Sequence, residues 1–362
     1  MKHKINFIVL MALSIMCISS CKKSETGTPP PGFAIGFHDA VFIVNEGSFG
    51  FGNGSVTYYN VINKSLRDDL FSYVNHRPLG DVVQSMNRIS GKFYIAVNNS
   101  QKIEVVSGSN FTSLSTITGI GSPRYMIEAS PGKIYVSDWN DNTVKIISSS
   151  TDMITGSIPT GTGPEQMIVS HGKVYVANIG GFSIDSMVTI IDASADTVLS
   201  ALTVGVNPGS FAKDANGKIW ILCSGWIGPD FTGGTADDIA GSLWKINPAN
   251  DSVETVMMMA QPDHPLKLAV NNAKDELYYL MSSSNYDGKV FRYGINDAAL
   301  PSAPLVDKTF YGLGVDPNNG NIFGGFVPSF SQKGYMFRYQ KSGVLIDSVK
   351  AGIAPNGFYF DY

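Results

Sequence analysis

The side chains best suited to chemistry are few and widely separated. His264 could act as a general base beside Glu165. The five histidines show no HExxH or other paired metal-ligand spacing, and neither a nucleophile elbow nor a phosphate-binding glycine loop is present. Asp230, Asp237 and Asp238 offer oxygen ligands for calcium, but their spacing fits no EF-hand loop. We therefore expect no catalytic centre, no metal site and no cofactor.

The composition favours a β protein with many turns. Of 362 residues, 15% are charged and 43% are hydrophobic, and there are 38 glycines and 18 prolines. This is too apolar for a disordered chain and too rich in glycine for a helical bundle. The net charge of -4 argues against a nucleic-acid partner, because such proteins carry clustered positive charge.

The N-terminus carries the pattern of an export signal. Lys2 and Lys4 precede about twelve mostly apolar residues (7–18), which is typical of a signal peptide and too short to span a bilayer. The sequence Ile-Ser-Ser-Cys ending at Cys21 resembles a bacterial lipobox, which implies cleavage before Cys21 and its lipidation. An ordinary signal peptide with a chance cysteine is the alternative. We assign residues 1–20 to the signal peptide, 21–36 to a flexible tether and 37–362 to the folded domain.

A repeated pattern fills the folded domain. A lysine or polar residue followed by an aromatic-centred apolar run begins near residues 92, 133, 173 and 218, with weaker copies near 41, 276 and 321. Seven copies of about 45 residues, each with four strand-like runs, predict a seven-bladed β-propeller. A solenoid is the alternative repeat architecture. The C-terminal run 354–360 matches the start of a repeat that the first copy lacks, so we expect it to supply the innermost strand of blade 1 and close the ring.

In such blades, the turns between blades and the loops after the second strand lie on one face. This face would be rich in amides and aromatic rings, which suits a bulky, mostly neutral ligand. The candidate ligand-binding residues are Asn45, Glu46, Phe49, Arg124, Tyr125, Trp139, Glu165, Gln166, Asn178, Asn207, Trp226, His264, Tyr286 and Phe330. The asparagines recur at equivalent positions, so an ordinary turn role is the alternative for each of them. For Trp139 and Trp226 the alternative is packing against a neighbouring blade.

The first repeat also resembles a known family. The stretch from Val41 to Gly50 (VFIVNEGSFG), continuing through GNGSVTYY to Tyr59, resembles the opening of the YncE-like, DUF5074-group surface propeller lipoproteins of Bacteroidetes-type bacteria. Some of these relatives bind cobalamin and pass it to a TonB-dependent outer-membrane transporter. The resemblance therefore implies an outer-membrane lipoprotein, on the cell surface or the periplasmic face, that captures a small molecule, with a corrinoid as the first ligand to consider.

Two other function classes remain open. A flat loop face would instead suit a protein-interaction or envelope scaffold, and the sparse His and Glu residues leave a propeller lyase or lactonase as a third reading. A concave pocket would favour capture of a small molecule. In each case we expect a monomeric domain, held at the membrane by its lipid.

We predict that Cys21 carries the membrane anchor. Cells grown with labelled palmitate should incorporate it into the wild-type protein, and Cys21→Ser should release the chain from the membrane fraction, because acyl chains supply the attachment. Wild-type protein that carries no label and fractionates away from membranes would contradict this assignment.

Overall fold

The computed structural model describes residues 37, 39–229, 234–282 and 287–361. The predicted signal peptide, the lipidation residue Cys21 and the predicted tether lie outside the described residues. None of the described helices combines the length and the apolar character that a membrane crossing requires.

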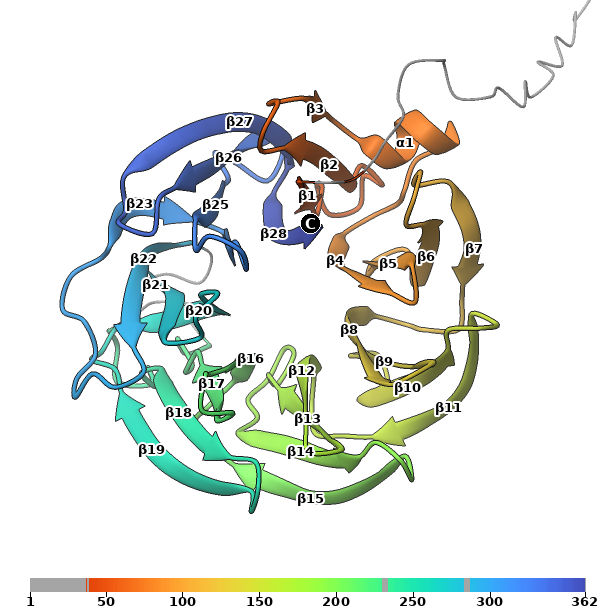
Figure 1. Cartoon of the computed structure of the whole chain (residues 1–362). Helices are drawn as coiled ribbons and strands as arrows, with labels where there is room; N and C mark the ends of the chain where they lie inside the picture. Colours follow the sequence, from red (N-terminus) through yellow and green to blue (C-terminus); the bar gives the residue numbers. More distant parts are fainter. Residues whose placement is uncertain (1–36, 38, 230–233, 283–286, 362) are drawn as a thin grey trace, which may run out of the picture. The chain divides into compact units, whose positions relative to one another are not determined.

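Seven four-stranded antiparallel sheets form the blades of a ring around a central channel (Figure 1), which confirms the predicted seven-bladed propeller. Blade 1 holds β28 (Pro355–Asp361), β1 (Ala40–Asn45), β2 (Ser55–Asn60) and β3 (Leu66–Arg67), followed by α1 (Leu70–Asn75). Blade 2 holds β4 (Val83–Ile89), β5 (Lys92–Val97), β6 (Lys102–Ser107) and β7 (Ser113–Ile117). Blade 3 holds β8 (Pro123–Ser130), β9 (Lys133–Asp138), β10 (Thr143–Ser148) and β11 (Met153–Pro159). Blade 4 holds β12 (Pro164–Ser170), β13 (Lys173–Asn178), β14 (Met187–Asp192) and β15 (Thr197–Thr203).

The remaining blades follow the same order, from the channel outward. Blade 5 holds β16 (Pro208–Lys213), β17 (Ile219–Cys223), β18 (Ser242–Asn247) and β19 (Ser252–Met258). Blade 6 holds β20 (His264–Val270), β21 (Glu276–Ser282), β22 (Gly288–Gly294) and β23 (Val306–Phe310). Blade 7 holds β24 (Gly312–Val315), β25 (Ile322–Phe326), β26 (Lys333–Tyr339) and β27 (Leu345–Ile353).

The two ends of the domain meet in blade 1, as the sequence predicts. The C-terminal strand β28 pairs antiparallel with β1, with Val41 opposite Phe360 and Ile43 opposite Phe358. Phe358 and Phe360 also pack on Phe323 of blade 7, with ring centroids 5.8 and 5.1 Å apart. Since β28 both completes blade 1 and covers blade 7, the ring closes without an open sheet edge at this seam.

Burial within a blade falls from the middle strands to the outermost strand, which lies at the rim of the ring. In β13 five of six residues are buried, and this strand carries the aromatic-centred apolar run that marks each repeat. The outer strand β15 has no buried residue. A strand covered on both faces is selected for near-continuous apolar character, so the second strands give the clearest repeat signal in the sequence.

A polar contact that we call the blade lock joins neighbouring blades. Lys133 and Tyr135 of β9 reach the turn between the outer two strands of blade 4 and donate to the carboxylate of Asp196, the lysine at 2.8 Å. Each lock aspartate adopts a left-handed backbone, with φ of 54°, 55° and 56° in chain order. The locks are Lys92 and Tyr94 with Asp152, Lys133 and Tyr135 with Asp196, and Lys173 and Tyr175 with Asp251.

The lock changes the acid-base behaviour of its members. Burial raises the pKa of Tyr94, and the adjacent Asp152 raises it further. Burial also disfavours the ionised form of Asp152, but hydrogen bonds from Lys92, Tyr94 and Ser115 outweigh it and hold the pKa below its usual value. The tyrosine therefore stays a donor and the aspartate stays an acceptor over the physiological pH range.

We predict that Asp152→Asn lowers the free energy of unfolding by about 1.5–3 kcal/mol near neutral pH, since hydrogen bonds to a charged acceptor are lost. The depressed pKa of folded Asp152 means that its contribution is present above the unfolded value of about 3.9 and is lost as the pH falls below it. Urea titrations at about pH 7 and about pH 3 should therefore show the wild type and the variant converging in acid.

Asp307→Asn is the matched control for Asp152→Asn. Asp307 pairs with Lys289 at 2.6 Å, but its side chain is 74% exposed, so its loss should change the free energy of unfolding by less than about 1 kcal/mol. Equal stability of Asp152→Asn and the wild type at neutral pH would show that the lock does not hold the blades together.

Candidate functional site

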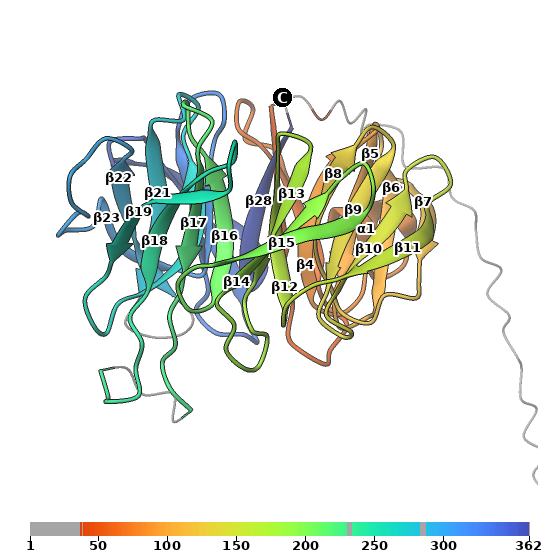
Figure 2. The same cartoon turned by 90° about the horizontal axis from the view of Figure 1, so that it is seen from below.

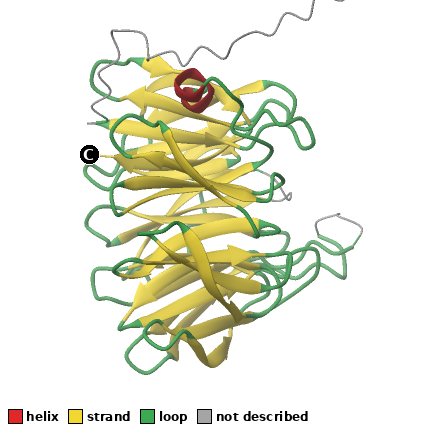
Figure 3. Cartoon of the chain, turned by 90° about the vertical axis from the view of Figure 1, so that its right-hand side faces the viewer, coloured by secondary structure: helices red, strands yellow, loops and turns green. Residues whose placement is uncertain are grey.

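The loops after the second strands and the turns that enter the innermost strands lie on one face, which we call the loop face. Its longest loop follows β17 and projects from the lower side of Figure 2 and the right side of Figure 3. The blade locks lie at the opposite ends of the strands, because β5, β9 and β13 each begin with the lock lysine. Stability and a candidate binding surface therefore occupy different faces of the ring.

Irregular pairing at the start of the innermost strands supplies side chains to the channel. The register shifts near the first residues of β4, β8, β12, β16, β20 and β28, whereas β24 pairs regularly. A β-bulge turns the extra residue away from the regular alternation and can aim it at a site. The residues that the register skips are Gln84, Arg124, Tyr125, Glu165, Gln166, Gly209, Lys267 and Asn356.

Arg124 and Glu165 form an ion pair among these channel residues. The Arg124 guanidinium donates from Nε to Glu165 Oε2 at 2.8 Å and from Nη2 to Oε1 at 2.9 Å. Its Nη1 donates to Gln84 Oε1 at 2.7 Å, and its charge lies 4.0 Å from the centre of the Trp139 ring. Burial disfavours the charged guanidinium, but Glu165 outweighs this and keeps the pKa of Arg124 above its usual value. Arg124 therefore links blades 2, 3 and 4 through its bonds to Gln84 and Glu165.

Polar residues from blades 1, 6 and 7 form a second group at the channel. Tyr311 donates to Glu46 Oε2 at 2.8 Å, and Lys267 Nζ donates to Asn356 Oδ1 at 2.5 Å. Burial raises the pKa of Glu46, although Lys267 and Tyr311 act to lower it. Burial and the nearby Glu46 also raise the pKa of Tyr311 well above its ordinary value. The channel thus holds two carboxylates and two cations in a confined space.

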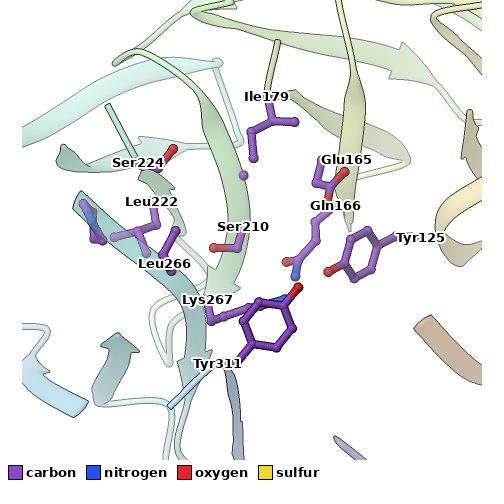
Figure 4. Close-up of a pocket in the computed structure, with 12 residues that line it drawn as sticks. Tyr125, Glu165, Gln166, Ile179, Ser210, Leu222, Ser224, Leu266, Lys267 and Tyr311 are labelled. Atoms are coloured by element: carbon purple, nitrogen blue, oxygen red, sulfur yellow. The ribbon is translucent and has the colours of Figure 1, made fainter. Parts of the chain in front are cut away.

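A cavity of about 170 Å³ opens beside these polar channel residues, between blades 4, 5 and 6 (Figure 4). Gly209 occupies the bulge position of β16, so blade 5 projects no side chain where its neighbours project Gln166 and Lys267. A Cβ atom added at Gly209 would lie 2.9 Å from Ile179 Cδ1. A second cavity of about 160 Å³ shares Tyr125, Gln166 and Lys267 with the first. The absent side chain at Gly209 is therefore what leaves room for a ligand group.

Exposed apolar side chains stand on the loops of the same face. They are Phe49, Phe51, Phe182, Ile184, Ile239 and Phe330. Phe182 is 98% exposed, and its ring meets Trp139 edge to face at 6.0 Å beside a hollow of about 280 Å³. Phe330 contacts Tyr311 in the same manner at 5.3 Å, which connects this outer apolar set to the wall of the channel cavity. Large apolar groups exposed together mark a contact surface.

The structure brings several of the predicted site residues together at the channel. Glu46, Arg124 and Glu165 interact with one another electrostatically, and Tyr125 and Gln166 line the cavity. Phe49, Trp139 and Phe330 lie on the surrounding loops, where Phe49 is largely exposed and Trp139 is half-buried. Trp226 is also half-buried, and its backbone pairs with Ile239 at the base of the blade 5 loop, outside the cavity wall. Tyr286 lies outside the described residues.

Three predicted asparagines are structural, which corrects their assignment to a ligand surface. Asn45 and Asn178 are fully buried, and their amides donate to backbone and threonine oxygens of the following strand. Asn207 adopts φ of 55°, and its side chain accepts from Asp185 N at 3.2 Å. Asparagine tolerates this backbone and bonds locally, so the turn role considered above explains all three.

His264 is likewise held inside the protein rather than beside Glu165. It is 3% exposed; its Nδ1 lies 2.9 Å from the carbonyl oxygen of Ser224, and its Nε2 lies 3.1 Å from Asp238 Oδ1. Both oxygens of Glu165 are occupied by Arg124. The proposed pairing of a histidine base with Glu165 is therefore wrong in this structure, as is a ligand-contact role for His264.

Cys223 is fully buried, and burial raises the pKa of its thiol to about 12, so it is a structural thiol. Among the described residues no group of three or more His, Cys, Asp or Glu side chains could hold a metal ion.

Gln84, Lys267 and Tyr311 are channel residues that were not predicted from the sequence. In blades 3, 4 and 6 the channel residues come one or two positions after the turn proline, as Lys267 follows Pro265. The predicted residues Asn207 and His264 instead precede the proline, and their side chains turn back into the blade. The position relative to the proline is the signal that could have found Lys267.

These features define the chain as a seven-bladed β-propeller with a channel cavity of mixed polar and apolar lining under a loop face bearing exposed aromatic rings. Residues 39–360 match the family model described as a domain of unknown function, DUF5074, and the chain belongs to this family. No curated protein sequence is significantly similar to it.

Solved propellers of several kinds share the fold. A quinoprotein alcohol dehydrogenase-like protein of Bacteroides thetaiotaomicron is 14% identical with a TM-score of 0.68, over 90% of this chain and 78% of that one. The periplasmic gluconolactonase of Pseudomonas aeruginosa is 10% identical with a TM-score of 0.64, over 88% and 99%. Hydrazine synthase of Kuenenia stuttgartiensis is 12% identical with a TM-score of 0.57, over 78% and 92%. At these identities the likeness concerns the fold alone.

We predict that Arg124→Met destabilises the protein by about 3–5 kcal/mol, because it leaves the carboxylate of Glu165 buried without its partner. Adding Glu165→Gln to the same chain should recover most of this loss, since the uncompensated charge is removed. Denaturant unfolding of the two variants checks both statements. If the double variant were as unstable as Arg124→Met alone, the cost would come from lost packing against Trp139 instead of the buried charge.

Proposed function

We propose that this chain is a ligand-binding propeller of the bacterial cell envelope that captures a small molecule on its loop face. The observation that carries the proposal is the combination found there: a concave cavity at the channel with polar and apolar walls, framed by loops with six exposed apolar side chains. Ligand sites commonly pair apolar contact area with a few placed polar groups. A scaffold that binds another protein remains the second reading, because the same apolar side chains could contact a partner.

A corrinoid is the ligand with which to begin. It is a broad apolar macrocycle whose edge carries amide groups, so aromatic rings could cover the macrocycle while polar residues bond the amides. A cavity of about 170 Å³ is too small to enclose such a molecule, so the macrocycle would lie across the loop face and send one side group into the cavity. Lipidation at Cys21 would keep the complex at the membrane, where a TonB-dependent receptor could accept the ligand.

We predict that the purified protein in detergent binds cyanocobalamin, and that Phe182→Ala weakens binding by about 30-fold, as expected for loss of an aromatic anchor. Phe182 is the best single choice because it is 98% exposed and contacts Trp139, so its truncation should leave the melting temperature nearly unchanged. Isothermal titration calorimetry with parallel thermal melts measures both effects.

Leu199→Ala is the control for this experiment. Leu199 is 53% exposed on the outer strand β15, so its truncation removes a comparable apolar group away from the loop face. Absence of heat with the wild type at high micromolar cyanocobalamin would reject the corrinoid. Binding that Phe182→Ala and Leu199→Ala affect equally would place the ligand on another surface.

A further inference from the structure

The cavity beside Gly209 has an ammonium group with spare hydrogen-bonding capacity. Lys267 Nζ lines the cavity, and among the described residues its one hydrogen-bond partner is Asn356 Oδ1. Among the described residues it forms no ion pair within 4.0 Å, and the carboxylate that it influences at longer range is Glu46. An ammonium has three donors, so two remain for a ligand. The bulge in β20, with φ of 53° at Lys267, is what turns this side chain toward the channel instead of into the blade.

Gln166 presents a second donor to the same space. Its Oε1 accepts from the backbone N of Phe211 at 3.2 Å, which fixes the amide so that Nε2 faces away from β16. Figure 4 shows the Gln166 amide, the Lys267 amine and the hydroxyl of Tyr125 directed toward one region of the cavity. A group that meets several donors at once must be rich in acceptors, and a carboxylate has two oxygens with about four lone-pair sites.

The other groups around the cavity are already occupied or apolar. Both oxygens of Glu165 bond Arg124, and the hydroxyl of Tyr311 donates to Glu46. Leu222 and Leu266 supply an apolar wall. The cavity is therefore built like a short pocket with donors at one side and hydrocarbon at the other, and its volume suits a small organic acid or one acid arm of a larger molecule.

We propose that the Gly209 cavity is a carboxylate subsite, in which Lys267 is the counter-ion and Gln166 a hydrogen-bond donor. This rests on the proposed function, because it names the chemistry that the same face selects. The ligand class is a small organic acid, or a larger ligand that carries a carboxylate on a short apolar arm. Gly209 determines the specificity of the site by leaving the space that the arm fills.

Trifluoropropionate and the uncharged trifluoropropanol are the probes, because they have nearly the same apolar group and differ in the carboxylate. Fluorine NMR of the full chain in detergent should show line broadening with trifluoropropionate that saturates, and about tenfold weaker binding of trifluoropropanol. Lys267→Gln should weaken trifluoropropionate by about tenfold or more and leave trifluoropropanol unchanged.

Gly209→Val tests the space itself, with Gly156→Val as its control. At both positions the backbone lies outside the left-handed region, and an added Cβ would approach the Cδ1 of an isoleucine, at 2.9 Å in the cavity and 3.1 Å on the outer strand β11. Gly209→Val should abolish binding of the probe, whereas Gly156→Val should retain it. If Gly209→Val does not fold, Lys267→Gln still decides the question.

Equal binding of the two probes, or binding that survives Lys267→Gln, would overturn the carboxylate subsite. These outcomes are separable from the proposed function. Cyanocobalamin binding without Lys267-dependent binding of trifluoropropionate would reject the subsite and support corrinoid capture. The opposite result would support the subsite and reject the corrinoid.

Discussion

The structure depends on contact between blades, because a four-stranded sheet of this size cannot bury both of its faces alone. The apolar clusters lie between neighbouring blades, as where Tyr175 of blade 4 packs with Phe211 and Ile219 of blade 5. Apolar packing alone does not fix the orientation of one blade against the next, whereas the directional hydrogen bonds of the blade lock do. Tyr175 crosses the same interface to bond Asp251, so one side chain contributes both apolar area and a fixed hydrogen bond. The ring can then hold a channel of constant geometry.

Because the blades are held in place, the innermost strands can carry β-bulges, which direct side chains to the channel. Arg124, Glu165 and Lys267 sit on bulges, and each would face a neighbouring sheet if the pairing stayed in register. Because the outer strands hold each blade in place, the innermost strand can give up a ladder hydrogen bond near its first residues. The polar residues at the channel and the Gly209 cavity are consequences of this arrangement.

The sequence was sufficient for the architecture. The run from Lys173 to Val176 and its copies mark strands buried on both faces, and the unmatched C-terminal run predicts the closure by β28. The blade locks were not predicted, although Lys173 and Tyr175 belong to the repeat signature. Their partner Asp251 lies 78 residues from Lys173, and only the ring brings them together. Local patterns reveal what a strand buries but not which distant turn it meets.

The candidate site was predicted only in part, because the sequence does not show which distant residues meet. Arg124 and Glu165 were predicted as separate ligand-binding residues, whereas the structure joins them in a bidentate ion pair across two blades. Asn45 and Asn178 have the residue type expected of a ligand contact, but full burial makes them structural. Whether a polar residue beside a turn faces the channel or the interior depends on bulges, and a bulge leaves little trace in a single sequence.

The repeated blade lock has a consequence for how such a ring could change in size. The junctions between blades 2 and 3, 3 and 4, and 4 and 5 use the same lysine, tyrosine and aspartate at equivalent positions. A blade duplicated in tandem within this arc would meet a compatible neighbour on either side. The seam between blades 7 and 1 offers no such freedom, since Lys64, Tyr59 and Arg338 converge there on Asp347 in a different arrangement. Internal duplication would therefore be tolerated between blades 2 and 5 and resisted at the seam between blades 7 and 1.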